Sequence, residues 1–280
     1  MSGALSGRWI VGGASARGSA HIRNGMPNQD AVAWGESGDA TRLAGAIADG
    51  HGAAAHFRSD VGAAIAVRSA VSLLQWRLDD QGEDESDAAI AGEVLALWRR
   101  DVAEHLTRHP YSEAEALIPQ ATDLSPYGAT LAAFATGDGM VVALHIGDGD
   151  LLFGYPDGTL ERPLHADAGL SGEETYSLCL PDAAARFRVS TLWRQEGARF
   201  PDFLFAASDG LAKSFRDEAA FVAAVAALKE RAFSDWAALE KALPDWLAEV
   251  SAAGSGDDCT VCIALARDIT ATDTDQNRGS

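Results

Sequence analysis

The tetrapeptide Asp49-Gly50-His51-Gly52 follows a short apolar run, residues 43–48, and precedes a long amphipathic pattern. This order places an acidic residue at the end of a strand, beside glycines that allow a tight backbone. Three later segments also place an Asp, flanked by Gly or by another Asp, beside an apolar run. They are residues 146–149, 207–211 and 256–260. One Asp-Gly pair is more often a turn than a ligand, but four oxygen-rich strand ends suit hard divalent cations.

Composition limits the classes of partner. The chain has 280 residues, with 22 Lys plus Arg against 41 Asp plus Glu, so its net charge is −19. That field disfavours nucleic acid and anionic membranes and suits a basic partner. The sequence shows no secretory signal and no apolar run long enough to span a membrane.

The cysteines indicate a reducing compartment. Their odd, sparse count of three argues against a disulfide framework and favours a cytoplasmic location. Cys259 and Cys262 form a CxxC pattern inside an apolar run that predicts a strand. Residues three apart on a strand point to opposite faces, so we expect neither a zinc site nor a redox pair there.

Hydrophobic periodicity predicts blocks of strands and helices. Period-two and short apolar runs predict strands at residues 8–14, 31–34 and 43–48, entering one sheet, and at 129–136, 141–146 and 151–155, forming a meander of hairpins. Further strands are predicted at 186–193, 203–207 and 259–266. Helical periodicity marks residues 53–78, 88–107, 218–230 and 234–250, the last broken or kinked at Pro244. Segregated blocks of this kind predict an α+β layered domain.

The long connection at residues 162–185 has little periodicity, which is typical of a functional flap. The domain is expected to span residues 8–267. Residues 1–7 form an N-terminal tail, and residues 268–280 a polar C-terminal tail that we expect to be disordered.

Three of the acidic residues suggest a chemistry if they converge. Asp49, Asp209 and Asp257 would repel one another unless a cation such as Mg²⁺ or Mn²⁺ lay among them. Two such ions about 4 Å apart share a water, lower its pKa and neutralise a phosphoryl oxygen under in-line attack. His51 could then protonate the leaving oxygen, and an Arg nearby could clamp the phosphate. The pattern favours metal-assisted hydrolysis of a phosphate ester.

The order of these segments resembles the metal-dependent Ser/Thr protein phosphatases of type 2C, the PPM family. The match covers nearly the whole chain, residues 8–267, and one further stretch, residues 170–176, resembles a bacterial branch of the family. The segments that carry it are Asn28-Gln29-Asp30, Ala48-Asp49-Gly50-His51-Gly52, Tyr127-Gly128-Ala129-Thr130-Leu131, Ile146-Gly147-Asp148-Gly149-Asp150, Ala207-Ser208-Asp209-Gly210-Leu211 and Asp257-Asp258-Cys259-Thr260.

The resemblance implies a four-layer αββα sandwich, with two central antiparallel sheets flanked by helices and two Mg²⁺ or Mn²⁺ ions at one edge. It implies that Asp49 bridges the ions and that the flap covers the site. The remaining implied roles are the Gly50 carbonyl on one ion, Asp209 and Asp257 on the other, Asp30 in the second shell through water, and His51 as general acid.

Four departures from the family pattern alter these expectations. Gln29 stands where a Glu is frequent, which weakens a water-mediated metal contact. Gly25 occupies the usual position of the phosphate-binding Arg; a short insertion makes Arg23 the equivalent, with His21 and Arg17 as alternatives.

The other two departures concern the acidic residues. Asp258 follows the final ligand, where an Asn is usual; we prefer Asp257 as the ligand, with Asp258 as the alternative. Lys213 stands four residues after Asp209, where many members place an Asp for a third metal. An ammonium repels a cation, so we do not expect a third metal at Asp148, and we expect Asp148 to pair with Lys213.

The sequence therefore predicts a bacterial, cytoplasmic signalling enzyme that hydrolyses phosphoserine and phosphothreonine on proteins. Its partners would be a phosphoprotein substrate and the pathway of a Ser/Thr kinase. The main alternative is a catalytically weak pseudophosphatase or phospho-binding module on the same fold. Two further alternatives are a phosphatase of small metabolites and a protein that only binds Ca²⁺; no Asp-rich twelve-residue loop closed by a Glu supports the last.

Overall fold

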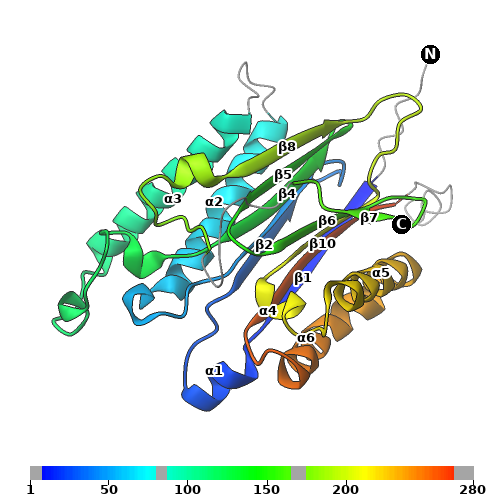
Figure 1. The fold of residues 1–280 in the computed structure, drawn as a ribbon. Coiled ribbons are helices and arrows are strands. Elements are labelled where there is room, and N and C mark those ends of the chain that lie inside the picture. Colours follow the sequence, from blue (N-terminus) through cyan, green and yellow to red (C-terminus); the bar gives the residue numbers. More distant parts are fainter. Residues whose placement is uncertain (1–7, 80–86, 165–174, 268–280) are drawn as a thin grey trace, which may run out of the picture.

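The structure, a computed structural model, describes residues 8–79, 87–164 and 175–267. Within them, two five-stranded antiparallel sheets pack face to face, and helices cover the outer face of each (Figure 1). The predicted α+β sandwich of four layers is thereby confirmed. The predicted tails, residues 1–7 and 268–280, lie outside the described residues.

Both sheets join segments that are distant in sequence. The first sheet has the order β1-β10-β9-β6-β7, with β1 at Arg8–Ala16, β10 at Cys259–Arg267, β9 at Phe203–Ala207, β6 at Asp150–Gly154 and β7 at Leu160–Glu161. The second has the order β2-β3-β4-β5-β8, with β2 at Ala31–Glu36, β3 at Leu43–Ala48, β4 at Leu131–Gly137, β5 at Met140–Ile146 and β8 at Arg188–Trp193.

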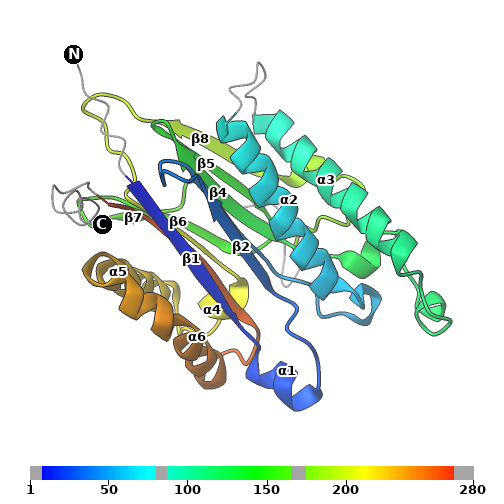
Figure 2. The ribbon, with the colours of Figure 1, turned by 180° about the vertical axis from the view of Figure 1, so that it is seen from behind.

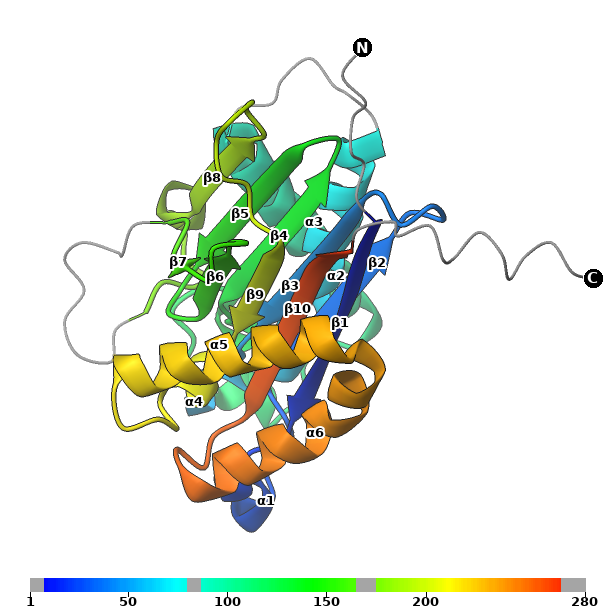
Figure 3. The ribbon, with the colours of Figure 1, turned by 90° about the vertical axis from the view of Figure 1, so that its right-hand side faces the viewer.

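Two long helices cover each sheet. The helices α2 (Ser59–Asp79) and α3 (Asp87–Arg108) lie on the second sheet (Figure 2). The helices α5 (Glu218–Ser234) and α6 (Trp236–Ala253) lie across the first (Figure 3). Two short helices, α1 (Ser19–Asn24) and α4 (Asp209–Ala212), follow the ends of β1 and β9. Among the described helices, none is long and apolar enough to cross a membrane.

The apolar core has three layers. One lies between α2, α3 and the second sheet, one between the two sheets, and one between the first sheet and α5 and α6. A strand in the middle of this sandwich is covered on both faces, which is why β3 (LAGAIA) and β9 (FLFAA) are buried at every residue. Such strands are continuous apolar runs in the sequence and do not alternate.

The helices on the first sheet begin at side-chain caps. The Asp217 carboxylate accepts from Ala220 N at 2.8 Å, and the Asp235 carboxylate accepts from Ala238 N at 3.0 Å. Each cap satisfies an amide that has no partner within its helix. The sequence predicted a break or a kink at Pro244, and there is no break, because α6 runs through this residue from Trp236 to Ala253. Burial of Leu239, Leu243 and Leu247 on one face offsets the missing amide bond.

Two predictions of strand pairing were wrong. The connection Gly147-Asp148-Gly149 does not make a hairpin: β5 pairs with β4 and β8, whereas β6 pairs with β9 and β7 in the other sheet. Likewise β1 does not share a sheet with β2 and β3. All of these strands are apolar runs, so the sequence pattern does not tell which sheet each one joins. Gly147 has φ of 107°, which suits glycine at the crossing.

The predicted flap is only partly described, because residues 165–174 lie outside the described ranges. Its later part packs firmly beside the start of β4. Leu178 N donates to Ala129 O at 3.0 Å, and Arg99 of α3 donates to Leu180 O at 3.2 Å. Leu178 is fully buried. Residues 177–180 are therefore a packed part of the domain.

Candidate active site

Connections at the end of the sandwich where α1 and α4 lie (Figure 1) contain four aspartates, and a fifth, Asp209, is the first residue of α4. Each comes directly before or after a core strand, so the sheet pairing places all five at one edge. They are Asp30 before β2, Asp49 after β3, Asp148 between β5 and β6, Asp209 after β9 and Asp257 before β10.

The charges of the other four aspartates all act on Asp49. Burial raises the pKa of this carboxyl well above its usual value, and Asp30, Asp209, Asp257 and Asp148 raise it further, in that order. The ordinary cause of such a rise is a cluster of like charges in a poorly solvated place. As they stand, however, no three His, Cys, Asp or Glu side chains among the described residues enclose a common point closely enough to hold an ion.

The surroundings of the Asp30 carboxylate favour the binding of a cation or a proton. Ser208 Oγ donates to its Oδ2 at 2.7 Å, while its Oδ1 is buried and has no hydrogen-bond partner. Burial is the largest cause that raises the pKa of Asp30 to about 7. An orphaned buried carboxylate oxygen next to Asp49 is the feature expected of an oxygen-ligand site for Mg²⁺ or Mn²⁺.

Lys213 lies within the same cluster. Its Nζ is 2.5 Å from Asp209 Oδ2, and its own side chain is 60% exposed. We expected Lys213 to pair with Asp148; its direct contact is instead with Asp209, although its charge also lowers the pKa of Asp148. Desolvation and Asp209 outweigh that effect and raise the pKa of Asp148 to about 6. One turn of helix separates the Lys from Asp209, which explains why they meet.

The adjacent residues Asp257 and Asp258 have different surroundings. Asp258 is 2% exposed and accepts from Gly18 N at 2.6 Å and from Gln29 N at 2.7 Å. Asp257 is 43% exposed, and its charge acts on Asp49 and Lys213. Both oxygens of Asp258 are thus occupied by backbone amides, whereas Asp257 faces the carboxylate cluster.

Close backbone contacts at two glycines make this arrangement possible. A Cβ on Gly50 would lie 2.7 Å from the carbonyl oxygens of Gln29 and Ser59. A Cβ on Gly210 would lie 2.1 Å from Asp258 O. Gly210 therefore lets the first turn of α4 approach the start of β10, which brings Asp209 towards Asp257.

His51 lies beside the cluster with its ring against His56, at 4.9 Å between centroids. Its backbone N donates to Gly128 O at 3.1 Å, which holds this segment against the connection that leads into β4. Burial is the largest cause that lowers the pKa of His51 to about 4; His56 lowers it further, and Asp209 opposes both. The His51 ring is therefore mainly neutral at pH 7, and it needs a negative charge beside it to hold the proton that a general acid donates.

Gln29 braces the backbone of the site. Its Nε2 donates to His51 O at 3.2 Å and to Ser59 Oγ at 2.6 Å, while its carbonyl accepts from Gly50 N at 3.1 Å. The side chain of Gln29 is thus engaged with two protein partners that follow Gly50 in the chain. The sequence predicted only a weakened contact to a metal-bound water and missed this bracing role.

The structure does not bring Arg23 to the carboxylates. Arg23 is exposed on α1, and its Nη1 donates to Ser19 Oγ at 3.3 Å. Arg17 is exposed too and donates to His21 O at 3.3 Å. His21 is the α1 residue that reaches the cluster, with Nδ1 at 3.0 Å from Asp258 Oδ2 and Nε2 at 3.4 Å from Asp257 Oδ1. Residues two apart on a helix point to nearly opposite sides, so Arg23 faces away from the cluster.

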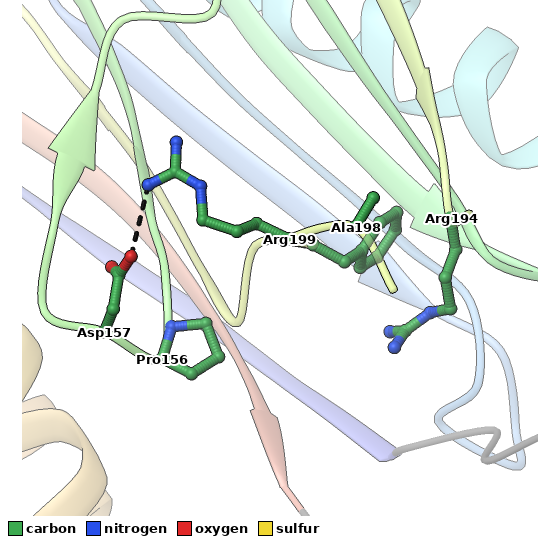
Figure 4. A pocket seen from close by; sticks show the side chains of 6 residues that line it. Pro156, Asp157, Arg194, Ala198 and Arg199 are labelled. Carbon is green, nitrogen blue, oxygen red and sulfur yellow. Dashed lines mark hydrogen bonds and ion pairs between the residues drawn. The ribbon is translucent and has the colours of Figure 1, made fainter. Parts of the chain in front are cut away.

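A surface hollow of about 310 Å³ lies elsewhere, between the turn after β6 and the connection from β8 to β9 (Figure 4). Its arginines are already engaged within the protein. Arg199 binds Asp157 at 3.3 Å and lies over the Tyr155 ring, and the Arg194 guanidinium lies 4.2 Å from the Phe200 ring centre. None of the five site aspartates lines the hollow, so we do not place the chemistry there.

Comparison with known proteins decides the family. The family model described as protein phosphatase 2C matches residues 17–248. The chain belongs to the protein phosphatase 2C family. It is accordingly a protein-serine/threonine phosphatase. The matched range contains the site residues from Asp30 to Asp209 and ends before Asp257. No curated protein sequence matches the chain significantly.

Solved structures share the fold at low identity. A serine/threonine phosphatase from S. agalactiae matches with a TM-score of 0.58 and 16% sequence identity. The match covers 92% of this chain and 100% of the S. agalactiae chain. The catalytic domain of the phosphatase PstP, solved with two manganese ions, matches with a TM-score of 0.56 and 19% sequence identity. The match covers 93% of this chain and 99% of the PstP domain. PppA, a regulator of T6SS in Pseudomonas aeruginosa, matches with 0.57 and 19%, covering 93% and 98%.

Proposed function

We propose that this phosphatase 2C hydrolyses phosphoserine and phosphothreonine on proteins with two Mg²⁺ or Mn²⁺ ions. Asp49 would hold both ions, the Gly50 carbonyl would bind one, and Asp209 and Asp257 would bind the other. The observation that carries the proposal is the mutual repulsion of the five aspartates around Asp49, together with the unpartnered oxygen of Asp30. The two manganese ions of the related PstP domain support the same ion count.

When bound, the ions supply a water nucleophile of lowered pKa and neutralise charge on the phosphoryl oxygens. Around them, Asp30 orients water through its free oxygen, and Gln29 keeps Gly50 and His51 in place. His51 gives its proton to the serine or threonine oxygen as that oxygen leaves. The negative charge of a phosphate beside the ring favours the protonated imidazole before transfer.

Asp257 is the proposed ligand in preference to Asp258. Asp258 is 2% exposed and already accepts hydrogen bonds from the backbone amides of Gly18 and Gln29, so a metal would have to compete with these bonds. Lys213 accounts for the proposed absence of a third metal at Asp148, because its ammonium already neutralises Asp209 on that flank. The phosphate-binding role of Arg23 stays a prediction; its guanidinium would first have to leave Ser19.

A cytoplasmic role in bacterial phosphoprotein signalling completes the proposal. All three cysteines are buried and free of disulfides, as in proteins of a reducing compartment. The relatives that share the fold include bacterial phosphatases.

The deciding experiment is phosphate release from a phosphothreonine peptide with Mn²⁺, with EDTA, and with Asp209→Asn. Asp245→Asn, at an exposed carboxylate of α6, is the matched control. Turnover that requires the metal, disappears in Asp209→Asn and persists in Asp245→Asn is the expected result. Metal binding without turnover would replace the proposal with a pseudophosphatase.

A further inference from the structure

We propose that the α1 ledge, defined as residues 17–26, binds the substrate polypeptide beside the phosphorylated residue and selects acidic side chains there. This inference rests on the proposed function, since it assigns a recognition surface to the same site. It reverses the expectation drawn from the net charge of −19, which favoured a basic partner.

The charge of the chain is unevenly distributed. The first 29 residues contain no Asp or Glu, and three of their basic residues, Arg17, His21 and Arg23, lie in the ledge, whereas Arg8 begins the far end of β1. All 41 acidic residues therefore lie from Asp30 onwards. A substrate docked at the ledge meets this local positive charge at contact distance, whereas more remote charges are screened within about 10 Å at ordinary ionic strength.

The ledge is anchored to the site. Gly18 N donates to Asp258 Oδ1 at 2.6 Å, and Ala20 N donates to Gly256 O at 2.8 Å. His21 bridges Asp257 and Asp258. These bonds hold α1 immediately beside a proposed metal ligand, so a peptide whose phosphate lies at the ions passes close to it. Anchoring of this kind lowers the ordering cost of binding.

The outer surface of the ledge is uncovered. None of the residues of α1 is buried, and the helix projects from the end of the sandwich below β1 and α6 (Figures 1 and 3). Arg17 and Arg23 are exposed, and so are Ile22, at 60%, and Met26, at 39%. Basic side chains next to uncovered apolar ones match a peptide segment that carries both acidic and apolar residues.

A peptide fits this surface better than a nucleic acid does. Strong binding of a nucleic-acid backbone needs many phosphate contacts, and the ledge offers two exposed arginines. The carboxylate cluster next to it would repel a continuous line of phosphates, whereas one phosphoryl group at the ions is neutralised there.

The test measures binding separately from turnover. Two fluorescent phosphothreonine peptides, identical except for Glu or Lys beside the phosphoresidue, are titrated with the full chain carrying His51→Gln, which removes the proposed proton donor and keeps the proposed metal ligands, in the presence of Mn²⁺. The Glu peptide is expected to bind several-fold more tightly. Adding Arg17→Glu is expected to lower its affinity by roughly fivefold, as for a surface ion pair replaced by a repulsion, with a smaller loss for Arg17→Gln.

Arg68→Glu, an exposed α2 residue on the other side of the molecule, makes the same charge change and is expected to leave the Glu-to-Lys preference unaltered. Ile22→Asn is expected to weaken both peptides equally. Equal binding of the two peptides, or the same loss with Arg68→Glu as with Arg17→Glu, would overturn the ledge proposal. Failure of the wild-type chain to hydrolyse p-nitrophenyl phosphate with Mn²⁺ would count against the proposed function alone, because the binding comparison does not depend on turnover.

Discussion

The two sides of the carboxylate cluster balance their charge differently. On the Asp49 side, the buried Asp30 and the half-buried Asp49 repel each other and have no cationic partner among the described residues. On the Lys213 side, Asp209 lies 2.5 Å from an ammonium, and Asp148 feels the same charge. We infer from this difference that only the Asp49 side of the site depends on an external cation to balance its charge. The Asp49 side should therefore supply most of the metal affinity, and the Lys213 side should limit how many ions bind.

The largest expected effect is that of Asp49→Asn. This change should abolish measurable Mn²⁺ binding and lower turnover by about 10³-fold or more, because the bridging carboxylate is lost. It should also stabilise the metal-free protein, by about 1 kcal/mol, because a buried charge facing four carboxylates is removed. Calorimetric titration with Mn²⁺ and thermal unfolding in EDTA measure the two effects. A lower melting temperature in EDTA would contradict the asymmetry between the two sides.

Alanine substitutions at the neighbouring residues Asp257 and Asp258 should have separate effects, one on Mn²⁺ binding and the other on the free energy of unfolding. Asp258→Ala leaves the amides of Gly18 and Gln29 unpartnered and should destabilise the protein by about 3 kcal/mol. Asp257→Ala should cost less than about 1 kcal/mol, since this side chain is 43% exposed, yet it should weaken Mn²⁺ binding at least tenfold. Urea unfolding and metal titration of both variants check this. If Asp258→Ala unfolded like the wild type, Asp258 would become the better candidate ligand.

A pH series in EDTA should reveal the unbalanced Asp49 side. The folded-state pKa of Asp30 is raised to about 7, so its contribution to stability is present at low pH and is lost as pH rises through 7. Burial, with Arg188 nearby, lowers the pKa of His145 to about 3, so its contribution is present above pH 6.5 and is lost as pH falls towards 3. The two oppose each other between pH 4 and 6.5.

His145→Gln should therefore expose the effect of Asp30. As pH falls below 6.5, the free energy of unfolding of the metal-free variant should rise relative to that of the wild type by about 1.4 kcal/mol per pH unit, which is the value for one proton. Urea midpoints at pH 5, 6 and 7 measure this gain. A constant difference between the two proteins across the series would show that His145 is not held neutral in the fold.

The smallest expected effect is that of Lys213→Met. Because Lys213 is 60% exposed, its competition with a metal at Asp209 is screened, and its removal should tighten Mn²⁺ binding by only about threefold. Lys213→Asp should go further and raise the number of bound ions from two to three. Calorimetry gives both the affinity and the count. An unchanged count in Lys213→Asp would place the limit elsewhere than in the ammonium.

Sequence reasoning succeeded where one local pattern decides the structure. The bounds of β3 and β9 follow from apolar runs that end at Asp49 and at Ser208. It failed where tertiary pairing decides: the crossing at Gly147 and Asp148 has the same residues as a hairpin turn. The six-residue helix α1 was missed because it buries none of its residues and so shows no apolar period.

The candidate site divides in the same way. The convergence of strand-end aspartates could be anticipated because each follows or precedes a core strand. The contacts of His21 with Asp257 and Asp258, and of Lys213 with Asp209, depend on side-chain directions at particular loops. Residue type does not distinguish Asp257 from Asp258, and only the family pattern favoured Asp257; the structure adds the two backbone amides that bind Asp258.

The bonds of Asp258 also bear on when the enzyme becomes active during its synthesis. The Asp258 side chain accepts a hydrogen bond from the amide of Gly18, 240 positions earlier in the chain, and β1 pairs along its whole length with β10. A growing chain that already contains Asp49 and Asp209 still lacks Asp257 and the strand that positions α1. Such distant contacts form late in folding. Dephosphorylation would therefore begin only after the ribosome has released the segment that contains Asp257 and β10, which keeps shorter products from acting on phosphoproteins.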